Sequence, residues 1–337
     1  MVVNKDGIRI KSEVIVYHDE TKNAGESRLK GHVLLFVPVK VIIEETGGLF
    51  GGNLTEIKTL SNLLEDIKTI KQEFKADHKF HFSEISGKKW AKRNYADKKI
   101  VESGVKYLRQ TKYFCKLGII FYEQPTKNQI IGYGGKTKNE KKLRFDETLL
   151  RMLLKGAVHY LYNNNHRIRI SKIVSDGQPY RRKLSELRII DRLIIEVRDY
   201  VEISEGAELI HLSSDHKRYE LDSEEYQHAN MLQLADMLLG STIHSCLRES
   251  KVEKEVPQIG DFVEDKKGII AYPMKEMLDK RKRGNGFKNS SHYKAFTISK
   301  AFIKNDGWGF ENVRTKEISI SDIGQLTLLD VQEKVYE

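Results

Sequence analysis

Four acidic residues lie where the neighbouring residues predict buried structure, and carboxylates in such positions could bind metal ions. Asp19 ends a run of strand-forming residues, and Asp176 ends the strand-like segment 167–175. Asp and Glu are depleted in strands, so an acid at the tip of an apolar strand needs an explanation. Glu84 lies within an aromatic patch, and Asp236 lies within an apolar helical segment. These four residues are the candidate catalytic and metal-binding set.

Each acid also has an explanation that involves no metal. Asp19 could simply face water where its strand ends, and Asp176 could form a turn with Gly177. Glu84 could be an exposed or capping residue, and Asp236 could lie on the polar edge of its helix. The joint pattern of four acids is more specific than any one of its members.

Asp236 has the most informative surroundings of the four. It lies within Leu232–Leu239, where most other residues are of the core type. Gln233 and Gly240, at i−3 and i+4, are its neighbours on the same helix face. A glycine in a helix is unfavourable by about 1 kcal/mol relative to alanine, but it lets the helix approach a sheet or a substrate closely.

Carboxylates that are buried together raise one another's pKa and are unfavourable unless a cation neutralises them. Mg²⁺ and Mn²⁺ are the ions that suit a ligand set made only of oxygen atoms. Two such ions roughly 3.5–4 Å apart can activate a water molecule and stabilise the leaving oxygen of a phosphodiester. The acids therefore indicate phosphodiester chemistry with two divalent metal ions.

The chain resembles a bacterial and phage family called domain of unknown function 3800 in four motifs: Tyr17-x-Asp19-Glu20, His81-Phe-Ser-Glu84, Ser175-Asp176 and Gln233-Leu-Ala-Asp236-x-x-x-Gly240. The resemblance covers roughly residues 14 to 247, and the last motif is its most specific piece. It implies a ribonuclease H-like fold in which a first-strand Asp, a Glu, a further strand Asp and an Asp on a late helix hold two divalent metals. Carried over to this chain, these ligands are Asp19, Glu84, Asp176 and Asp236. The family's occurrence further implies a role in phage defence or in the biology of mobile elements.

Two segments depart from the family pattern. The loop after Glu20 is longer than usual, and an extra charged segment, 217–227, precedes the helix of Asp236. Asp215 and Glu20 are therefore reserve candidates for the metal site, although Glu20 points to the other face of its strand. His18, His81 and His216 lie next to acids and could carry protons, or they could be packed and hydrogen-bonded histidines.

The order of the predicted elements indicates an α/β fold. Strand patterns come first and then alternate with helical ones, which is typical of a mixed sheet flanked by helices. The predicted strands span residues 14–20, 32–39, 113–122, 167–175 and 209–212, and 41–45 either continues the second strand or forms another. The predicted helices span residues 55–74, 95–110, 145–161, 184–200 and 224–247, and residues 123–144 are expected to form a flexible insertion. A ribonuclease H-like domain is predicted over residues 1–247, followed by a basic C-terminal extension over residues 248–337.

The charge balance favours a nucleic acid, DNA or RNA, as the partner. The net charge is +10 and the isoelectric point is about 9.2. Arg181, Arg182 and Lys183 follow Asp176 closely and are predicted to contact phosphates, unless they form the solvated start of the next helix. The basic segment 280–283 could clamp a nucleic-acid backbone or form a surface loop.

The sequence is typical of a cytoplasmic protein. The two cysteines are far apart and lack metal-site spacing, which favours a reducing compartment. The N-terminal residues lack the apolar core of a signal peptide, and no apolar run approaches the roughly 20 residues that span a bilayer. We therefore expect no membrane partner.

The favoured interpretation is a metal-dependent nuclease. A non-catalytic nucleic-acid-binding or regulatory protein on the same fold is the main alternative. A polynucleotidyl transferase of the transposase type is a third, because the same metal chemistry supports strand transfer.

Overall fold

The computed structural model describes residues 8–21, 29–45, 54–123, 136–162, 166–176, 200–247, 254–282, 294–304 and 307–312. Every structural statement below concerns these ranges.

The described strands form one mixed sheet of eight strands. The strands are β1 (Ile8–Thr21), β2 (Leu29–Glu45), β3 (Leu54–Ile57), β4 (Lys116–Glu123), β5 (His166–Asp176), β6 (Val201–Leu212), β7 (Phe296–Lys304) and β8 (Gly307–Asn312). They are arranged in the order β6-β5-β1-β2-β4-β7-β8, with β3 paired to β2. β1 pairs in parallel with β5 and antiparallel with β2, and β5 pairs in parallel with β6. The carboxyl ends of β1, β5 and β6 therefore meet at one edge of the sheet.

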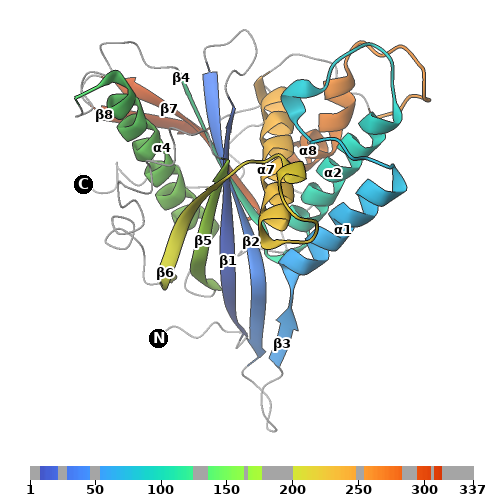
Figure 1. Ribbon diagram of the computed structural model, residues 1–337. Coiled ribbons are helices and arrows are strands. Elements are labelled where there is room, and N and C mark those ends of the chain that lie inside the picture. The colour runs from blue at the N-terminus through green and yellow to red at the C-terminus, as the bar shows by residue number, and fades with distance from the viewer. Residues whose placement is uncertain are drawn as a thin grey trace.

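Helices cover both faces of the sheet, as Figure 1 shows. One face carries α4 (Lys138–Leu161), and the other carries α1 (Thr59–Glu73), α2 (Lys92–Arg109), α7 (Glu224–Leu247) and α8 (Lys266–Lys282). Three short 3-10 helices complete the described elements: η1 (Phe82–Glu84), η2 (Thr111–Tyr113) and η4 (His216–Arg218).

The central strand β1 is apolar on both faces because helices bury both of them. Ile15 and Tyr17 point into the core beneath α7, whereas Val14 and Val16 point into the core beneath α4. This alternation decides where the acids at the end of β1 point. Asp19 continues the row of Ile15 and Tyr17, and it therefore lies on the face that α7 covers.

Helix α7 is apolar around most of its circumference because the sheet, α2 and α8 surround it. All residues from His228 to Leu239 are buried. An Asp in this stretch therefore lies in a packed interior and not on a solvated helix edge.

The predicted α/β class with a mixed sheet and flanking helices is confirmed, and α7 has the predicted bounds 224–247. β1 and β2 are longer than predicted, and residues 41–45 continue β2.

Several predicted boundaries are wrong. The strand predicted from residue 113 begins at Lys116, because residues 111–113 form η2, and the strand predicted from residue 209 begins at Val201. Residues 54–57 form a short strand paired with β2, so the predicted helix does not begin at Thr55, and α1 begins only at Thr59. Helix α4 begins at Lys138, within the predicted insertion, because Thr137 and Glu140 form a capping box at its start. Residues 124–135 of the predicted insertion and residues 184–199 of the predicted helix 184–200 lie outside the described residues.

The segments after residue 254 join the same sheet and core. β7 pairs with β4, and Ile269, Ile270 and Met274 of α8 lie in the core beneath α7. The division between residues 247 and 248 stays a prediction. The residues 280–282 of the expected basic loop belong to the end of α8.

Candidate metal centre

Asp19 and Asp176 end two neighbouring parallel strands. In the register of β1 and β5, Tyr17 pairs with Val174 and His18 pairs with Ser175. Tyr17 and Val174 both point into the core beneath α7, so the acids two residues further along point to the same face. Adjacent strands lie about 4.8 Å apart. The fold therefore brings Asp19 and Asp176 side by side at the edge where strand carboxyl ends meet.

Asp236 lies on α7 over the end of β1. Near its start, α7 is fixed to β1 by a hydrogen bond of 3.0 Å between Tyr17 Oη and His228 Nδ1. Near its end, Leu239 packs against Gly31, which is the β2 partner of Thr21. Because Asp236 lies between these two contacts, it is level with the strand ends that carry Asp19 and Asp176.

Two hydrogen bonds hold the Asp236 carboxylate in place. Its Oδ2 accepts from the backbone N–H of Phe82 and lies 2.7 Å from Nδ1 of His81. The bond to Asp236 raises the pKa of His81. Asp236 is only 8% exposed, so these donors partly compensate its burial.

Gln233 connects the separate pieces of the candidate centre. Its Oε1 accepts from the backbone N–H of Phe80 (3.0 Å), and its Nε2 donates to the carbonyl of Ser214 (2.6 Å). The backbone N–H of Ser214 in turn donates to Oδ1 of Asp176 (2.9 Å). One buried amide thus links α7, the segment of Glu84 and the loop after β6 that binds Asp176. The sequence placed Gln233 beside Asp236, but this connecting role is visible only in the fold.

Gly240 explains how the segment of Glu84 approaches α7. A Cβ atom at position 240 would lie 2.2 Å from Cγ and 2.4 Å from Cβ of Phe82. The glycine therefore permits a close approach, but its partner is Phe82 of η1 and not the sheet or a substrate that the sequence led us to expect.

Glu84 is the least enclosed of the four acids. It ends η1, its side chain is 54% exposed, and one of its carboxylate oxygens lies 3.9 Å from the guanidinium of Arg93. Its negative charge makes a small contribution to the raised pKa of His81, the residue that contacts Asp236. Glu84 therefore lies at the open side of the centre, two residues after the backbone N–H that binds Asp236.

The reserve residues occupy other positions. Asp215 caps η4, where its side chain accepts from Lys217 N–H, and it contacts Arg218. His216 is buried against Gln233, and burial lowers its pKa to about 4. His18 lies on the opposite face of the sheet, between Ser175 and His32.

The four acids do not form a single tight group in the described part of the chain. Among the residues that the structure describes, Glu20, His32 and Asp146 form the one group of three whose ligand atoms all lie within 4.8 Å of one another, and this group is on the face beneath α4. Sequence reasoning missed His32 and Asp146, because the two are far apart in sequence and no fixed spacing relates them. The available signals were an acid beside Phe145 in an apolar helix and a histidine beside Val33 in an apolar strand.

The predicted phosphate-binding residues Arg181, Arg182 and Lys183 lie outside the described residues.

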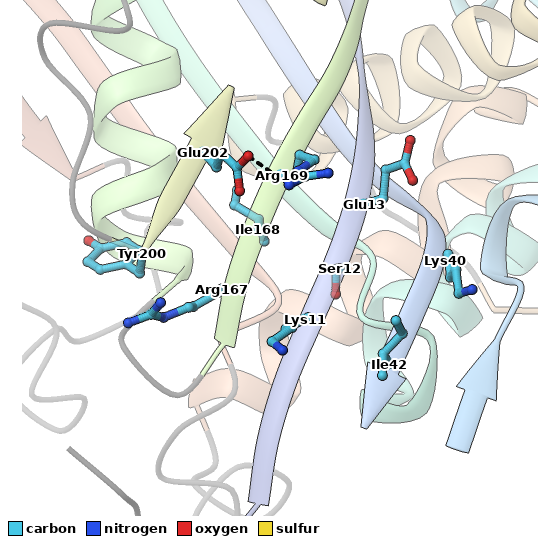
Figure 2. Close-up of a pocket in the computed structure, with 10 residues that line it drawn as sticks. All are labelled: Lys11, Ser12, Glu13, Lys40, Ile42, Arg167, Ile168, Arg169, Tyr200 and Glu202. Atoms are coloured by element: carbon cyan, nitrogen blue, oxygen red, sulfur yellow. Dashed lines mark ion pairs between the residues drawn. The ribbon is translucent and has the colours of Figure 1, made fainter. Parts of the chain in front are cut away.

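A separate pocket of about 430 Å³ lies where β1 and β5 begin, distant along the strands from the acids (Figure 2). Its lining includes Lys11, Lys40 and Arg169, whose charges are paired with Glu44, Glu56 and Glu202. Because these cations already have partners, and because the remaining charged lining residues, Arg167 and Glu13, are opposite in sign, the pocket has no clear preference for an anionic ligand.

Neither a comparison with protein-family models nor one with curated proteins finds a match to this chain. Among the described helices, none combines the length and apolar character that crossing a membrane requires.

Proposed function

We propose that this protein is a metal-dependent nuclease of ribonuclease H-like fold that hydrolyses phosphodiester bonds with two Mg²⁺ or Mn²⁺ ions. Asp19, Glu84, Asp176 and Asp236 would hold the ions. The resemblance to the family called domain of unknown function 3800 implies this ligand set and a role in phage defence or mobile-element biology.

The main support for the proposal is that three of the four acids lie at one edge of the sheet. Asp19 and Asp176 end adjacent parallel strands on the face covered by α7, and Asp236 projects from α7 at the same level. Ligand sites in open α/β sheets are found outside the carboxyl ends of the strands.

The residues at this edge suit divalent cations with oxygen ligands. Asp19 and Asp236 are 5% and 8% exposed, and buried carboxylates are stable only when positive charge or donors compensate them. When bound, two ions supply an activated water and stabilise the leaving oxygen. The protein's own residues orient the ligands: Phe82 N–H and His81 fix Asp236, and Ser214 N–H fixes Asp176.

The open side of the centre suits an extended anionic chain. Glu84 is exposed there, and Lys267 of α8 extends along the same segment, where its Nζ lies 3.3 Å from the carbonyl of Ser83. The net charge of +10 favours a nucleic acid over a small neutral substrate.

The test is cleavage of labelled single-stranded and double-stranded DNA, RNA and hybrid duplexes by purified protein with Mg²⁺ or Mn²⁺. Asp19→Asn and Asp236→Asn should each lower the cleavage rate at least roughly 100-fold, because each loses a charged ligand. Asp215→Asn is the matched control, because this acid caps η4 and is not in the proposed ligand set.

Cleavage that both Asn variants retain would overturn the proposal. Binding of nucleic acid without metal-dependent cleavage of any substrate would favour the non-catalytic alternative. Joined strands among the products would instead identify a polynucleotidyl transferase.

A further inference from the structure

A second group of ligand-type side chains lies on the opposite face of the sheet from the acids considered above. Glu20 of β1 and His32 of β2 are directly paired across the antiparallel ladder, with 3.9 Å between Glu20 Oε2 and His32 Nε2. Asp146 of α4 completes the group, and one ligand atom from each of the three residues lies within 4.8 Å of the others. β1 thus directs consecutive acids, Asp19 and Glu20, to opposite faces.

Two polar atoms of this group are buried without a hydrogen bond. His32 and Asp146 are 1% and 4% exposed. Within the ranges that the structure describes, neither His32 Nε2 nor Asp146 Oδ2 has a hydrogen-bond partner. Leaving such groups unsatisfied is unfavourable, and each one in a native protein needs an explanation. Both belong to one group, so a cation between them would satisfy both atoms together.

The other nitrogen of His32 is held as in many metal-binding histidines. His32 Nδ1 lies 2.9 Å from Nε2 of His18, and His18 Nδ1 lies 2.8 Å from Oγ of Ser175. If His32 Nδ1 donates to His18 and His18 Nδ1 donates to Ser175, both rings are neutral and His32 Nε2 presents a lone pair. An N–H on the non-ligating nitrogen that donates to a fixed acceptor is the usual support of a metal-bound imidazole.

Packing fixes the ring of His32 in this position. The ring stacks on His18 and on Tyr122, and Tyr122 contacts Phe145, the neighbour of Asp146. Burial lowers the pKa of His32 to about 3, and the charge of Lys30 acts in the same direction. The neutral imidazole is the form that binds a metal.

The charged groups that act on Asp146 are Lys142 and Lys30. Lys142 is exposed and Lys30 is half-buried, so solvent can screen both ammonium groups. Burial is the largest influence on Asp146, and it raises the pKa of this carboxyl to about 6. The lysines therefore do not replace a cation among the three ligand atoms.

We propose that Glu20, His32 and Asp146 bind one divalent transition-metal ion of the Zn²⁺ type, which fastens α4 to the β1–β2 pair. Two carboxylates and an imidazole form a mixed oxygen and nitrogen set, which suits Zn²⁺ better than Mg²⁺. Ligand atoms around tetrahedral Zn²⁺ are roughly 3.3 Å apart, so small side-chain movements would close the group. The site would be independent of the nuclease ligands, which lie on the other face.

The experiment measures Zn²⁺ binding by equilibrium dialysis of full-length protein against Zn²⁺ in excess Mg²⁺. The parent carries Asp19→Asn and Asp236→Asn, so the proposed nuclease site does not contribute. The parent should bind one Zn²⁺ per chain, and its melting temperature should rise with Zn²⁺ concentration. Glu20→Gln, His32→Gln and Asp146→Asn should each weaken binding at least roughly 100-fold, more than the loss of an outer-shell partner would.

His166→Gln is the matched control and should bind Zn²⁺ as the parent does. His166 is a buried histidine that bonds to Ser12 at the beginning of β1 and β5. If His32→Gln fails to fold, Zn²⁺ binding by the Glu20→Gln variant still tests the proposal, because Glu20 is only partly buried. Absence of saturable Zn²⁺ binding, or binding that Glu20→Gln and Asp146→Asn leave unchanged, would overturn the proposal without bearing on nuclease activity.

Discussion

At the scale of single residues, hydrogen bonds between side chains and backbone determine the geometry of the candidate centre. Asp176 accepts from Ser214 N–H, and Asp236 accepts from Phe82 N–H. Gln233 connects both of these segments through its single amide. The identity of Gln233 matters because its amide offers a donor and an acceptor from one uncharged planar group.

Replacing Gln233 should therefore damage both stability and activity. Gln233→Leu leaves Phe80 N–H and Ser214 C=O without their partner, and each buried unsatisfied group is unfavourable by about 1–3 kcal/mol. We expect the free energy of unfolding, measured in urea, to fall by about 2–5 kcal/mol. Gln227→Leu, at an exposed bond on the same helix, is the control. Equal stability of the two variants would show that the amide does not connect these segments.

Lys116 should make the free energy of unfolding depend on pH in a way that a surface lysine does not. Burial lowers its pKa to about 7, with a smaller effect of the Lys294 charge, and its Nζ donates to the carbonyl of Leu161. Between pH 7 and the unfolded pKa of about 10.4, the unfolded chain binds more protons than the native one. This residue therefore makes stability rise with pH across that window and fall as pH decreases towards 7.

Lys116→Met should remove this slope, which is at most about 1.4 kcal/mol per pH unit. Urea unfolding at pH 7.5 and pH 9 measures it, and Lys92→Met at an exposed position is the control. An unchanged slope in Lys116→Met would contradict a neutral buried amine.

At the scale of elements, sequence periodicity was sufficient to predict the type of those elements that are buried on nearly all sides. The apolar runs of β1 and α7 predicted a buried strand and a buried helix, and Asp19 and Asp236 were found within them. The predicted helix includes residues 55–57 because Ile57 fits its spacing, but pairing with β2 makes these residues part of a strand. Such tertiary pairing has no local signal.

The candidate centre was predictable only in part, because its geometry also depends on contacts between segments far apart in sequence. Apolar neighbours in the sequence indicated that the acids lie in buried structure. The position of Asp19 and Asp176 at one edge of the sheet, however, depends on the β1–β5 register. The group of Glu20, His32 and Asp146 depends on how α4 packs over β1 and β2. Neither long-range arrangement can be read from residue spacing.

Gly240→Ala tests the packing of η1 on α7. The added methyl would overlap both Cγ and Cβ of Phe82, so a change of rotamer cannot relieve it. The backbone of η1 should shift and weaken the bond from Phe82 N–H to Asp236. We expect loss of about 1–3 kcal/mol of stability and a lower metal-dependent cleavage rate. Ser245→Ala on the same helix is the control, and full activity of Gly240→Ala would contradict this packing role.

At the scale of the whole molecule, the first and the last described strands, β1 and β8, belong to one sheet. β7 pairs with β4, and α8 packs on α7 and α2, so residues beyond 254 support the helix that carries Asp236. The two faces of this sheet differ: one carries the proposed nuclease centre and the other the proposed transition-metal site.

A fragment of residues 1–253 should therefore not reach the native state. It lacks the apolar residues of α8 that lie in the core beneath α7, and it leaves the edge of β4 unpaired. Circular dichroism and urea unfolding should reveal a loss of cooperative unfolding relative to the full chain. Cooperative unfolding of the fragment with the full chain's stability would instead support an independent domain that ends near residue 247.

The proposed function requires two divalent metals at the edge where β1 and β5 end. Anomalous diffraction from a crystal of the protein soaked in Mn²⁺ would locate these ions. Two Mn²⁺ peaks about 3.5–4 Å apart are expected among Asp19, Glu84, Asp176 and Asp236. Absence of Mn²⁺ from this edge, in crystals of protein that still cleaves nucleic acid in Mn²⁺, would contradict this requirement.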